Sequence, residues 1–447
     1  MTEDILTRFS PATADWFRGA FATPTAAQQG AWEAISSGRH ALVVAPTGSG
    51  KTLSAFLWAL DRLATSAPPT EARRRCRVVY VSPLKALAVD VERNLRSPLI
   101  GIGHASQRLG LPVPEVTVAV RSGDTPAAER RIFAKTPADI LITTPESLFL
   151  LLTSAARESL AGVETVILDE VHAVAGTKRG AHLALTLERL DALLPAPAQR
   201  IGLSATVRPI EEVARFLAGG RPVEIVAPPS TKEWDLRVVV PVPDLGSLGE
   251  PTGDLSGPAA GDPRRTSIWP HVEERIVDLV ADHRSTLVFA NSRRLAERLT
   301  TRLNEIWEDR TDSEAEAAAP ATTLPATGIP AQVMAQAGAA RGAPALLARA
   351  HHGSVSREQR TIIEEDLKAG RLPAVVATSS LELGIDMGAV DLVVQVESPP
   401  SVASGLQRVG RAGHQVGAVS RGVLFPKFRG DLVQTAVVVE RMRAGAI

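Results

Sequence analysis

Residues 40–52, HALVVAPTGSGKT, decide the fold class of this chain. The stretch opens with an apolar run typical of a buried strand, continues through two glycines, and ends on Lys51 and Thr52, just before the helix-like LSAFLWALDRLA. A strand, a glycine-rich turn and a helix in this order predict a phosphate-binding loop, because glycines let backbone N–H groups surround an anion that the helix N-terminus also attracts. Ala45 stands where the general GxxxxGK[ST] pattern has its first glycine.

This loop supplies the first candidate site residues. Lys51 is expected to neutralise phosphate and the Thr52 hydroxyl to reach Mg²⁺, so the predicted cofactors are ATP and Mg²⁺. The alternative is a glycine-rich turn that binds nothing, and the flanking strand and helix argue against it. The residues of the loop predicted to bind ATP are Thr47, Gly48, Ser49, Gly50, Lys51 and Thr52.

The alternation of apolar runs, polar turns and helical stretches continues along the chain. RVVYVSPLKAL, ADILITTPESL, TVILDEVHA and QRIGLSATV are continuously apolar before a polar end, as are parallel strands covered on both faces. STLVFANSRR, LPAVVATSSLELGIDM and VDLVVQVESPP repeat the pattern later in the chain. We therefore predict an α/β fold of two large domains, each with a parallel sheet flanked by helices.

Shifts in composition predict the domain boundaries. The stretch PVPDLGSLGEPTGDLSGPAAGDPRR is rich in proline and glycine and has little to bury, which indicates an exposed linker. An alanine- and proline-rich insert at about 310–344 is expected to form a mobile loop in the second domain. The predicted organisation is a first domain over residues 1–227, a linker over 228–270, a second domain over 271–430, and a terminal helix over 431–447 that leads toward a downstream domain absent from the chain.

Charge, hydropathy and cysteine content exclude several classes of protein. Lysine plus arginine number 49, as do aspartate plus glutamate, so no overall basic charge announces nucleic acid and any nucleic-acid track must be local. The N-terminus lacks a signal-peptide pattern, and no apolar run is long enough to cross a bilayer. The single cysteine, Cys76, fits a reducing compartment. We expect a cytoplasmic protein, nucleoid-associated if bacterial, with no membrane partner.

A second acidic centre follows the apolar strand in TVILDEVH. Asp169 is expected to hold Mg²⁺, and Glu170 to orient or deprotonate the water that attacks the phosphate. Taken alone, an Asp-Glu pair at a strand end is as consistent with a solvated turn. Downstream of a phosphate loop, the catalytic interpretation is favoured.

Four motifs now stand in a fixed order: the phosphate loop, DEVH at 169–172, SAT at 204–206 and QRVGRAGH at 407–414. In this order the chain resembles the superfamily 2 helicases. FATPTAAQQGAW, VSPLKALAVDVERNL, TLVFANSRRLAERL and SVASGLQRVGRAGHQVG make it most similar to the large helicase-related (Lhr) family. The resemblance implies two tandem RecA-like domains with an ATP cleft between them, a DNA-stimulated ATPase, single-stranded DNA as the track, movement from 3′ to 5′, and a role in DNA repair.

The resemblance also assigns roles to individual residues. Gln28 matches the glutamine that reads the adenine edge, and Gly384 and Asp386 match the element that meets the nucleotide when the cleft closes. Two arginines three residues apart lie on one helix face, so they can reach across a cleft to phosphate, although surface pairing with carboxylates is the alternative. The set carrying these arginine fingers is Gln407, Arg408 and Arg411, and the residues that link ATP state to domain movement are His172, Ser204 and Thr206.

The candidate nucleic-acid contacts are polar residues at the ends of the other strands. Hydroxyls, backbone N–H groups and scattered basic side chains bind the phosphate backbone without reading bases. Each of them singly is more often a helix cap or turn former, and His351 and His352 lack further ligands at the spacing a metal requires. The candidates are Ser82, Pro83, Lys85, Arg121, Thr143, Thr144, Asn291, Ser292, Arg293, His352, Thr378 and Ser379.

The predicted function is therefore an ATP-dependent DNA helicase or translocase. Its predicted partner is single-stranded DNA or a duplex containing DNA or RNA, and nothing in the sequence indicates a protein partner. Two alternatives stay open at this point. One is an RNA helicase, because the contacts are mostly to phosphate, and the other is an ATP-gated nucleic-acid clamp or scaffold that does not unwind.

Overall fold

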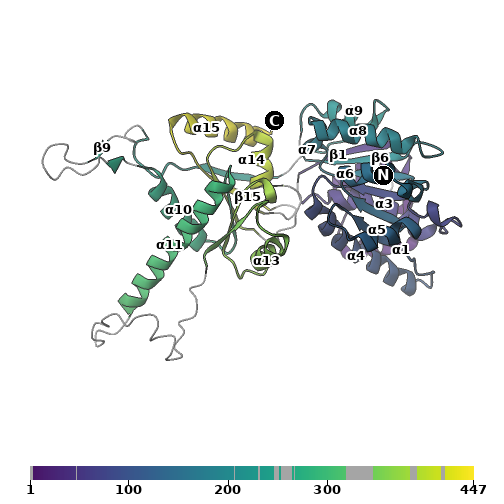
Figure 1. Cartoon of the computed structure of the whole chain (residues 1–447), viewed down its shortest axis with the longest axis horizontal. Coiled ribbons are helices and arrows are strands. Elements are labelled where there is room, and N and C mark those ends of the chain that lie inside the picture. Colours follow the sequence, from purple (N-terminus) through teal and green to yellow (C-terminus); the bar gives the residue numbers. More distant parts are fainter. Residues whose placement is uncertain are drawn as a thin grey trace.

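The computed structural model describes residues 4–46, 48–205, 207–229, 232–245, 251–252, 264–265, 267–318, 346–382, 390–413 and 418–447. Within these ranges the chain forms two parallel sheets, one of seven strands and one of six, each flanked by helices. Figure 1 shows them as two bodies side by side, the first in purple to teal and the second in green to yellow. The predicted fold class, two tandem RecA-like domains, is confirmed.

The first sheet has the strand order β3-β4-β2-β5-β6-β1-β7, and every neighbouring pair is parallel. Its strands are β1 (His40–Val44), β2 (Val78–Val81), β3 (Val118–Arg121), β4 (Ile140–Thr143), β5 (Thr165–Leu168), β6 (Gln199–Ser204) and β7 (Val223–Val226). The helices are α1 (Pro11–Ala20), α2 (Ala26–Ser36), α3 (Lys51–Thr65), α4 (Lys85–Arg108), α5 (Ala127–Lys135), α6 (Pro145–Leu152), α7 (Val171–Ala175), α8 (Lys178–Asp191) and α9 (Ile210–Ala218).

Both faces of this sheet are buried, which explains the continuous apolar runs. Alternate residues of β1 enter different core clusters: Val43 packs with Trp32 and Phe56 on one face, whereas Leu42 packs with Leu187 and Leu217 on the other. Successive side chains of a strand point to opposite faces, so a strand covered on both sides must be apolar throughout. The run that predicted a parallel sheet therefore also fixes helices above and below it.

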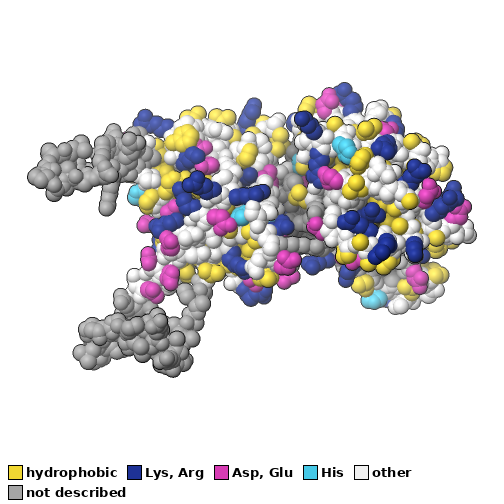
Figure 2. All heavy atoms as spheres, viewed as in Figure 1, with side chains coloured by type: hydrophobic (Ala, Val, Ile, Leu, Met, Phe, Trp, Pro, Cys, Tyr) yellow, Lys and Arg dark blue, Asp and Glu magenta, His cyan; other side chains and the backbone are white. Residues whose placement is uncertain are grey.

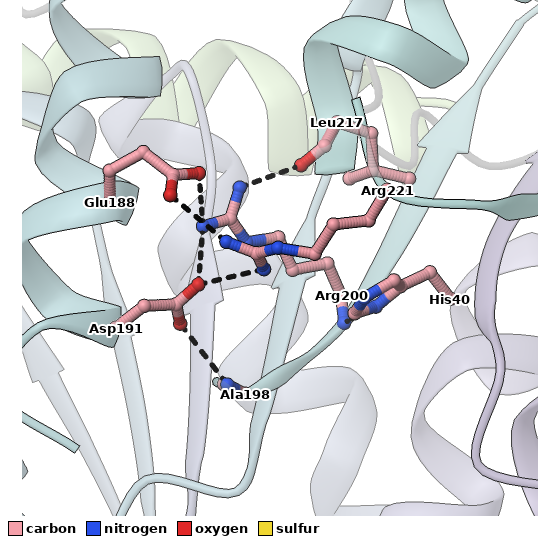
Figure 3. Close-up of polar contacts among 7 residues, drawn as sticks. All are labelled: His40, Glu188, Asp191, Ala198, Arg200, Leu217 and Arg221. Carbon is pink, nitrogen blue, oxygen red and sulfur yellow. Dashed lines mark hydrogen bonds and ion pairs between the residues drawn. The ribbon is translucent and has the colours of Figure 1, made fainter. Parts of the chain in front are cut away.

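An ion-pair cluster ties helices to the amino end of β6, remote from the phosphate loop (Figure 3). The buried Arg200 side chain donates to Glu188 at 2.8 Å and to Asp191 at 2.7 Å, and also to the Leu217 carbonyl at 3.1 Å. Arg221 pairs with the same two carboxylates at 2.9 and 2.8 Å. Two guanidinium groups thus balance two carboxylates, which connects α8, α9 and β6 without leaving a buried charge uncompensated.

The second sheet has the order β12-β13-β11-β14-β15-β8, again with parallel neighbours. Its strands are β8 (Trp234–Val238), β11 (Thr286–Phe289), β12 (Ala348–His351), β13 (Ala374–Ala377), β14 (Leu392–Val396) and β15 (Ser420–Phe425). The helices are α10 (Trp269–Ala281), α11 (Arg293–Ala318), α13 (Arg357–Lys368), α14 (Val402–Val409) and α15 (Arg429–Ala444), and a short antiparallel pair joins β9 (Pro251–Thr252) to β10 (Arg264–Arg265).

The structure corrects two predicted boundaries. Strand β8 lies inside the predicted linker 228–270 and pairs with β15, so the second sheet begins at Trp234 rather than after residue 270. The reason is local: Trp234 and Leu236 pack into the second core, although proline-rich sequence flanks them. Helix α11 also continues to Ala318, into the insert predicted to begin at about residue 310, and residues 319–345 lie outside the description.

Strand order divides each sheet into two halves. In the first sheet β5, β6 and β1, which precede the DEVH, SAT and phosphate-loop motifs, are neighbours, whereas β3, β4 and β2 lie together on the other side. In the second sheet β12, β13 and β11 are neighbours, and β14, β15 and β8 form the other half. Parallel strands end at one edge, so in the first domain the phosphate loop and the acidic centre occupy one half of that edge and the predicted track residues occupy the other.

The surface carries charges of both signs. Figure 2 shows lysine and arginine side chains interspersed with aspartate and glutamate over the viewed face of both domains, as the balanced composition implies. No helix in the described ranges combines the length and the apolar character that crossing a membrane requires.

Candidate functional site

The glycine-rich loop predicted to bind phosphate lies between β1 and α3. Gly48 and Gly50 have φ of 81° and 78°, a left-handed backbone that favours glycine, and Gly50 caps the start of α3 at Lys51. A Cβ on Gly50 would lie 2.6 Å from the Gln28 side-chain amide. Glycine is therefore required at this position both for its backbone angle and for the close approach of Gln28. The Lys51 ammonium donates to the Ser204 carbonyl at 3.4 Å.

Gln28 is held against the loop by a capping box at the start of α2. Its side-chain oxygen accepts from the Thr25 N–H at 2.9 Å, and Thr25 Oγ1 accepts from the Gln28 N–H at 3.3 Å. Thr25 also donates to the carbonyl of Ser49 at 3.1 Å, which joins α2 to the loop. Gln28 is only 4% exposed, so its position is set by packing as well as by these bonds.

The acidic centre faces Lys51. Asp169 follows β5, and Glu170, which is buried, takes a left-handed backbone with φ of 45° before α7 begins. Burial and the charge of Glu170 raise the pKa of Asp169 to about 7. Burial lowers the pKa of Lys51, while Glu170 and Asp169 oppose that effect. Two carboxylates thus share one ammonium group in a desolvated site, which favours the arrival of a further cation.

The arrangement fits Mg²⁺. This ion is usually bound by one or two carboxylates together with substrate phosphates and water. Across the described ranges, no group of three or more histidine, cysteine or acidic side chains forms a complete metal site. A carboxylate next to the phosphate loop, with the Thr52 hydroxyl at the start of α3, is the donor set that a phosphate-bound Mg²⁺ needs.

His172 joins the two domains. Its Nδ1 accepts from the Ala205 N–H at 3.2 Å and lies 3.2 Å from Ser204 Oγ, while its Nε2 lies 2.6 Å from the Gln407 amide of the second domain. Burial lowers the pKa of His172, so near pH 7 the ring is neutral. Because Nδ1 accepts from the Ala205 N–H, the ring proton lies on Nε2, which is 3.4 Å from Glu170 Oε2. The predicted coupling residues His172 and Ser204 are therefore in contact with one another, and His172 also contacts the second domain.

Two arginines near the end of α14 differ in their surroundings. Arg408 lies in the helix and Arg411 just beyond it, and both are 2% exposed. Arg408 is engaged inside the second domain: it pairs with Glu382 at 2.9 Å and donates to Asn291 at 3.0 Å and to Gln395 at 2.9 Å. Arg411 donates to the Glu382 carbonyl at 3.0 Å, and its charge lowers the pKa of Lys51 in the other domain. Arg411 is therefore close enough to the phosphate loop for its charge to act on Lys51, whereas Arg408 is held by partners within the second domain.

Lys232 is a cation of this cleft that sequence reasoning did not single out. It lines a cavity of about 250 Å³ together with Pro46, Ala205 and Gln407, and its ammonium donates to the Gly410 carbonyl at 3.2 Å. Burial lowers its pKa to about 8, helped by the charges of Arg411 and Lys51. The only signal in the sequence was a lysine two residues before a tryptophan, after Pro228 and Pro229, in a chain with few lysines.

The track candidates of the first domain use their hydroxyls within the protein. Thr143, at the end of β4, donates to the Arg121 carbonyl at 2.8 Å. Thr144 caps α6 by accepting from the Ser147 N–H at 3.4 Å, and Ser82 donates to the Leu84 carbonyl at 3.0 Å. These contacts are the caps and turns that the sequence left open as the alternative. Pro83 is buried, and Arg121 is partly buried at the end of β3.

The track candidates of the second domain are more exposed. Asn291, Ser292 and Arg293 follow β11 at the surface, where Arg293 donates to Ser354 Oγ at 2.8 Å. His352 is the exception, since it is 4% exposed and its Nε2 lies 2.5 Å from Glu297. Thr378 and Ser379 begin a short 3-10 turn after β13. The ends of three neighbouring strands, β12, β13 and β11, are thus brought together.

Some predicted residues lie outside the described ranges. They are Thr47, Thr206, Gly384 and Asp386, and the side chain of Lys85 at the start of α4 is not described either.

The fold and this cleft define a class of protein. A DEAD/DEAH box helicase model matches residues 25–214, and a helicase conserved C-terminal domain model matches residues 335–415. The chain is thus the two-domain core of a superfamily 2 helicase.

Whole-chain comparison identifies the family. The chain is 65% identical over 446 residues to the Lhr helicase/probable uracil glycosylase of Mycolicibacterium smegmatis and 56% identical over 446 residues to the Lhr helicase/uracil glycosylase of Escherichia coli. It belongs to the Lhr family. These matches cover 99% and 98% of the chain but 28% of each relative, so the chain spans less than a third of their length.

A solved structure agrees with this assignment. The structure of Mycobacterium smegmatis helicase Lhr bound to ssDNA and AMP-PNP matches with a TM-score of 0.84 and 62% sequence identity. The match covers 99% of this chain and 51% of that one.

Proposed function

We propose that this chain hydrolyses ATP and uses the energy to move along single-stranded DNA, displacing a paired strand. The observation that carries the proposal is one site assembled from two domains: Lys51 and Glu170 stand on one side, Arg411 stands on the other, and Gln407 lies 2.6 Å from His172 between them. The Mycobacterium smegmatis relative was solved with single-stranded DNA and an ATP analogue, which supports this ligand pair.

Hydrolysis is assigned to the nucleotide halves of the sheets. The loop N–H groups and Lys51 hold the phosphates, and Gln28 meets the adenine edge. Glu170 orients the attacking water, and Arg411 stabilises the charge that develops on the transferred phosphoryl group. Mg²⁺, held through Asp169 and Thr52, would neutralise part of that charge.

Movement is assigned to the change in cleft closure. ATP contacts both domains, so it favours the closed arrangement, and its hydrolysis removes that preference. His172 contacts both Ser204 and Gln407, so the state of the phosphate site is transmitted across the interface. The polar strand ends of the two track halves each hold DNA phosphates, and each cycle changes the spacing between the two grips. Movement from 3′ to 5′ and a role in DNA repair belong to the same proposal.

The test compares ATP hydrolysis with single-stranded DNA, single-stranded RNA and no nucleic acid. Stimulation by DNA is expected. Stimulation by RNA alone would indicate an RNA helicase instead of a DNA helicase. No stimulation by either would favour a nucleic-acid clamp that does not unwind. Displacement is tested separately on duplexes with a 3′ or a 5′ single-stranded tail, with unwinding expected only from the 3′ tail.

A further inference from the structure

Tyr80 is the only tyrosine of the chain, and it lies on the strand that borders the nucleotide half of the first sheet without belonging to a predicted motif. It stands on β2, beside Ile167 of β5, and it is 0% exposed. Its hydroxyl donates a hydrogen bond to Asp169 Oδ2. A buried tyrosine hydroxyl needs a partner, and here the partner is the carboxylate proposed to hold Mg²⁺.

Both oxygens of that carboxylate are oriented by the protein. Oδ1 of Asp169 accepts from the Glu170 N–H at 2.9 Å, and Oδ2 accepts from Tyr80. A carboxylate oxygen has two lone pairs, so each oxygen keeps capacity for a metal ion or a metal-bound water after accepting one bond. Rotation of the carboxylate would break one or both bonds. The hydroxyl therefore selects one orientation of Asp169.

The position of the hydroxyl is in turn set by the phosphate-loop helix. The Tyr80 ring stacks on Phe56 of α3, with centroids 5.0 Å apart and an interplanar angle of 28°. Helix α3 begins at Lys51, so one packed chain of side chains links the helix that receives the phosphates to the acidic residue of β5. A shift of α3 relative to β5 would therefore move this ring and its hydroxyl.

We infer that Tyr80 is a positioning residue for the metal: it holds the Asp169 carboxylate in the orientation that binds a divalent cation together with the nucleotide. The inference rests on the proposed ATPase function. Loss of a partner that orients a metal ligand typically costs about 10- to 100-fold in metal affinity or activity. A residue that serves packing alone would leave metal affinity unchanged.

The variant Tyr80→Phe keeps the ring and its stack but removes the hydroxyl. The expected result is that half-maximal ATP hydrolysis requires about 10- to 100-fold more Mg²⁺, whereas binding of a labelled ATP analogue in EDTA stays at the wild-type value. Thr186→Val is the matched control, because it also removes a buried hydroxyl, one that donates to the His182 carbonyl at 2.7 Å on α8. Wild-type metal dependence in Tyr80→Phe overturns the inference.

A second measurement needs no variant. Growth on 3-fluorotyrosine places one fluorine label in the chain, at Tyr80. The ¹⁹F resonance of the AMP-PNP complex is expected to shift when Mg²⁺ replaces EDTA, and an unchanged resonance overturns the inference even if Tyr80→Phe does not fold. If the wild-type chain binds no nucleotide, the proposed function fails as well. If the wild type hydrolyses ATP and only the Tyr80 results are negative, the function stands and the role of Tyr80 does not.

Discussion

The two halves of each sheet use their polar side chains in different ways. In the nucleotide half, partly or fully buried charges of like sign lie near one another, as Asp169 does with Glu170 and as Lys51 does with Arg411 and Lys232. In the track half of the first domain, the Thr143 hydroxyl donates to a carbonyl and the Thr144 hydroxyl caps a helix. Crowded like charges cost stability and persist at functional sites, whereas capped hydroxyls stabilise the fold whatever the chain binds.

This comparison predicts that the largest effects come from the nucleotide half. Arg411→Ala is expected to lower ATP turnover by about 10³- to 10⁵-fold, the range seen for arginine fingers, while ATP still binds the first domain. Time courses of ATP hydrolysis measure turnover, and titration with a labelled ATP analogue measures binding. Unchanged turnover would mean that the second domain does not complete the site.

Arg408→Ala serves as the counterpart. Because Arg408 pairs with Glu382 inside the second domain, its loss is expected to destabilise that domain by about 3–5 kcal/mol. Denaturant unfolding measures this loss. Arg411→Ala is expected to unfold at a denaturant concentration closer to the wild-type value than Arg408→Ala does.

The second effect in size concerns the acidic centre. Glu170→Gln removes the base that orients or deprotonates water and is expected to slow hydrolysis by about 10²- to 10⁴-fold. ATP affinity is expected to stay the same or rise, because the substitution removes a negative charge next to the phosphates. Near-normal turnover in a folded variant would exclude Glu170 from the catalytic step.

Substitution of Lys232 is expected to have a smaller effect, which is on ATP affinity and depends on pH. Its pKa is about 8, and a bound phosphate would raise it, so above pH 8 the amine takes up a proton on binding. ATP affinity is therefore expected to be constant below pH 8 and to fall as the pH rises above it. Lys232→Met should weaken binding by about tenfold, the equivalent of 1.4 kcal/mol.

The control for this behaviour is Lys232→Arg, which stays charged at these pH values. It should retain affinity at pH 9, where the wild type loses it. Titrations of a labelled ATP analogue at pH 7, 8 and 9 separate the variants, and a wild-type affinity independent of pH would remove Lys232 from the phosphate site.

The smallest effect is expected in the track half. Arg293, exposed beyond β11, is a phosphate contact in the proposal. Arg293→Ala should weaken binding to all DNA sequences by a similar factor and reduce the slope of log affinity against log salt concentration by about 1. Fluorescence anisotropy at several salt concentrations checks this, and an unchanged slope would contradict the proposed contact.

The sequence predicted the features whose causes are local. Gly50 and Lys51 announce the phosphate loop because the backbone angle, the helix start and the phosphate charge all act within a few residues. The contact between His172 and Gln407 joins residues 235 apart in sequence, and only the resemblance to helicases indicated that they lie at one interface. Such a contact depends on how two domains pack, which no local pattern encodes.

The missed residues have physical explanations as well. Tyr80 in an apolar strand looks like a core aromatic, and it is one; its hydroxyl gains meaning only from the neighbouring strand that carries Asp169. Strand β8 is short and follows prolines, so composition indicated a linker, although its place in the sheet comes from pairing with β15 far along the chain.

The position of β8 also limits how far the two domains can separate. The segment that connects the two sheets runs from Val226, the last residue of β7, to Trp234, the first residue of β8. Both strands lie at the edges of their sheets. Eight residue steps at 3.3–3.6 Å each reach less than about 30 Å. A tether of this length keeps the second domain at a high effective concentration beside the first.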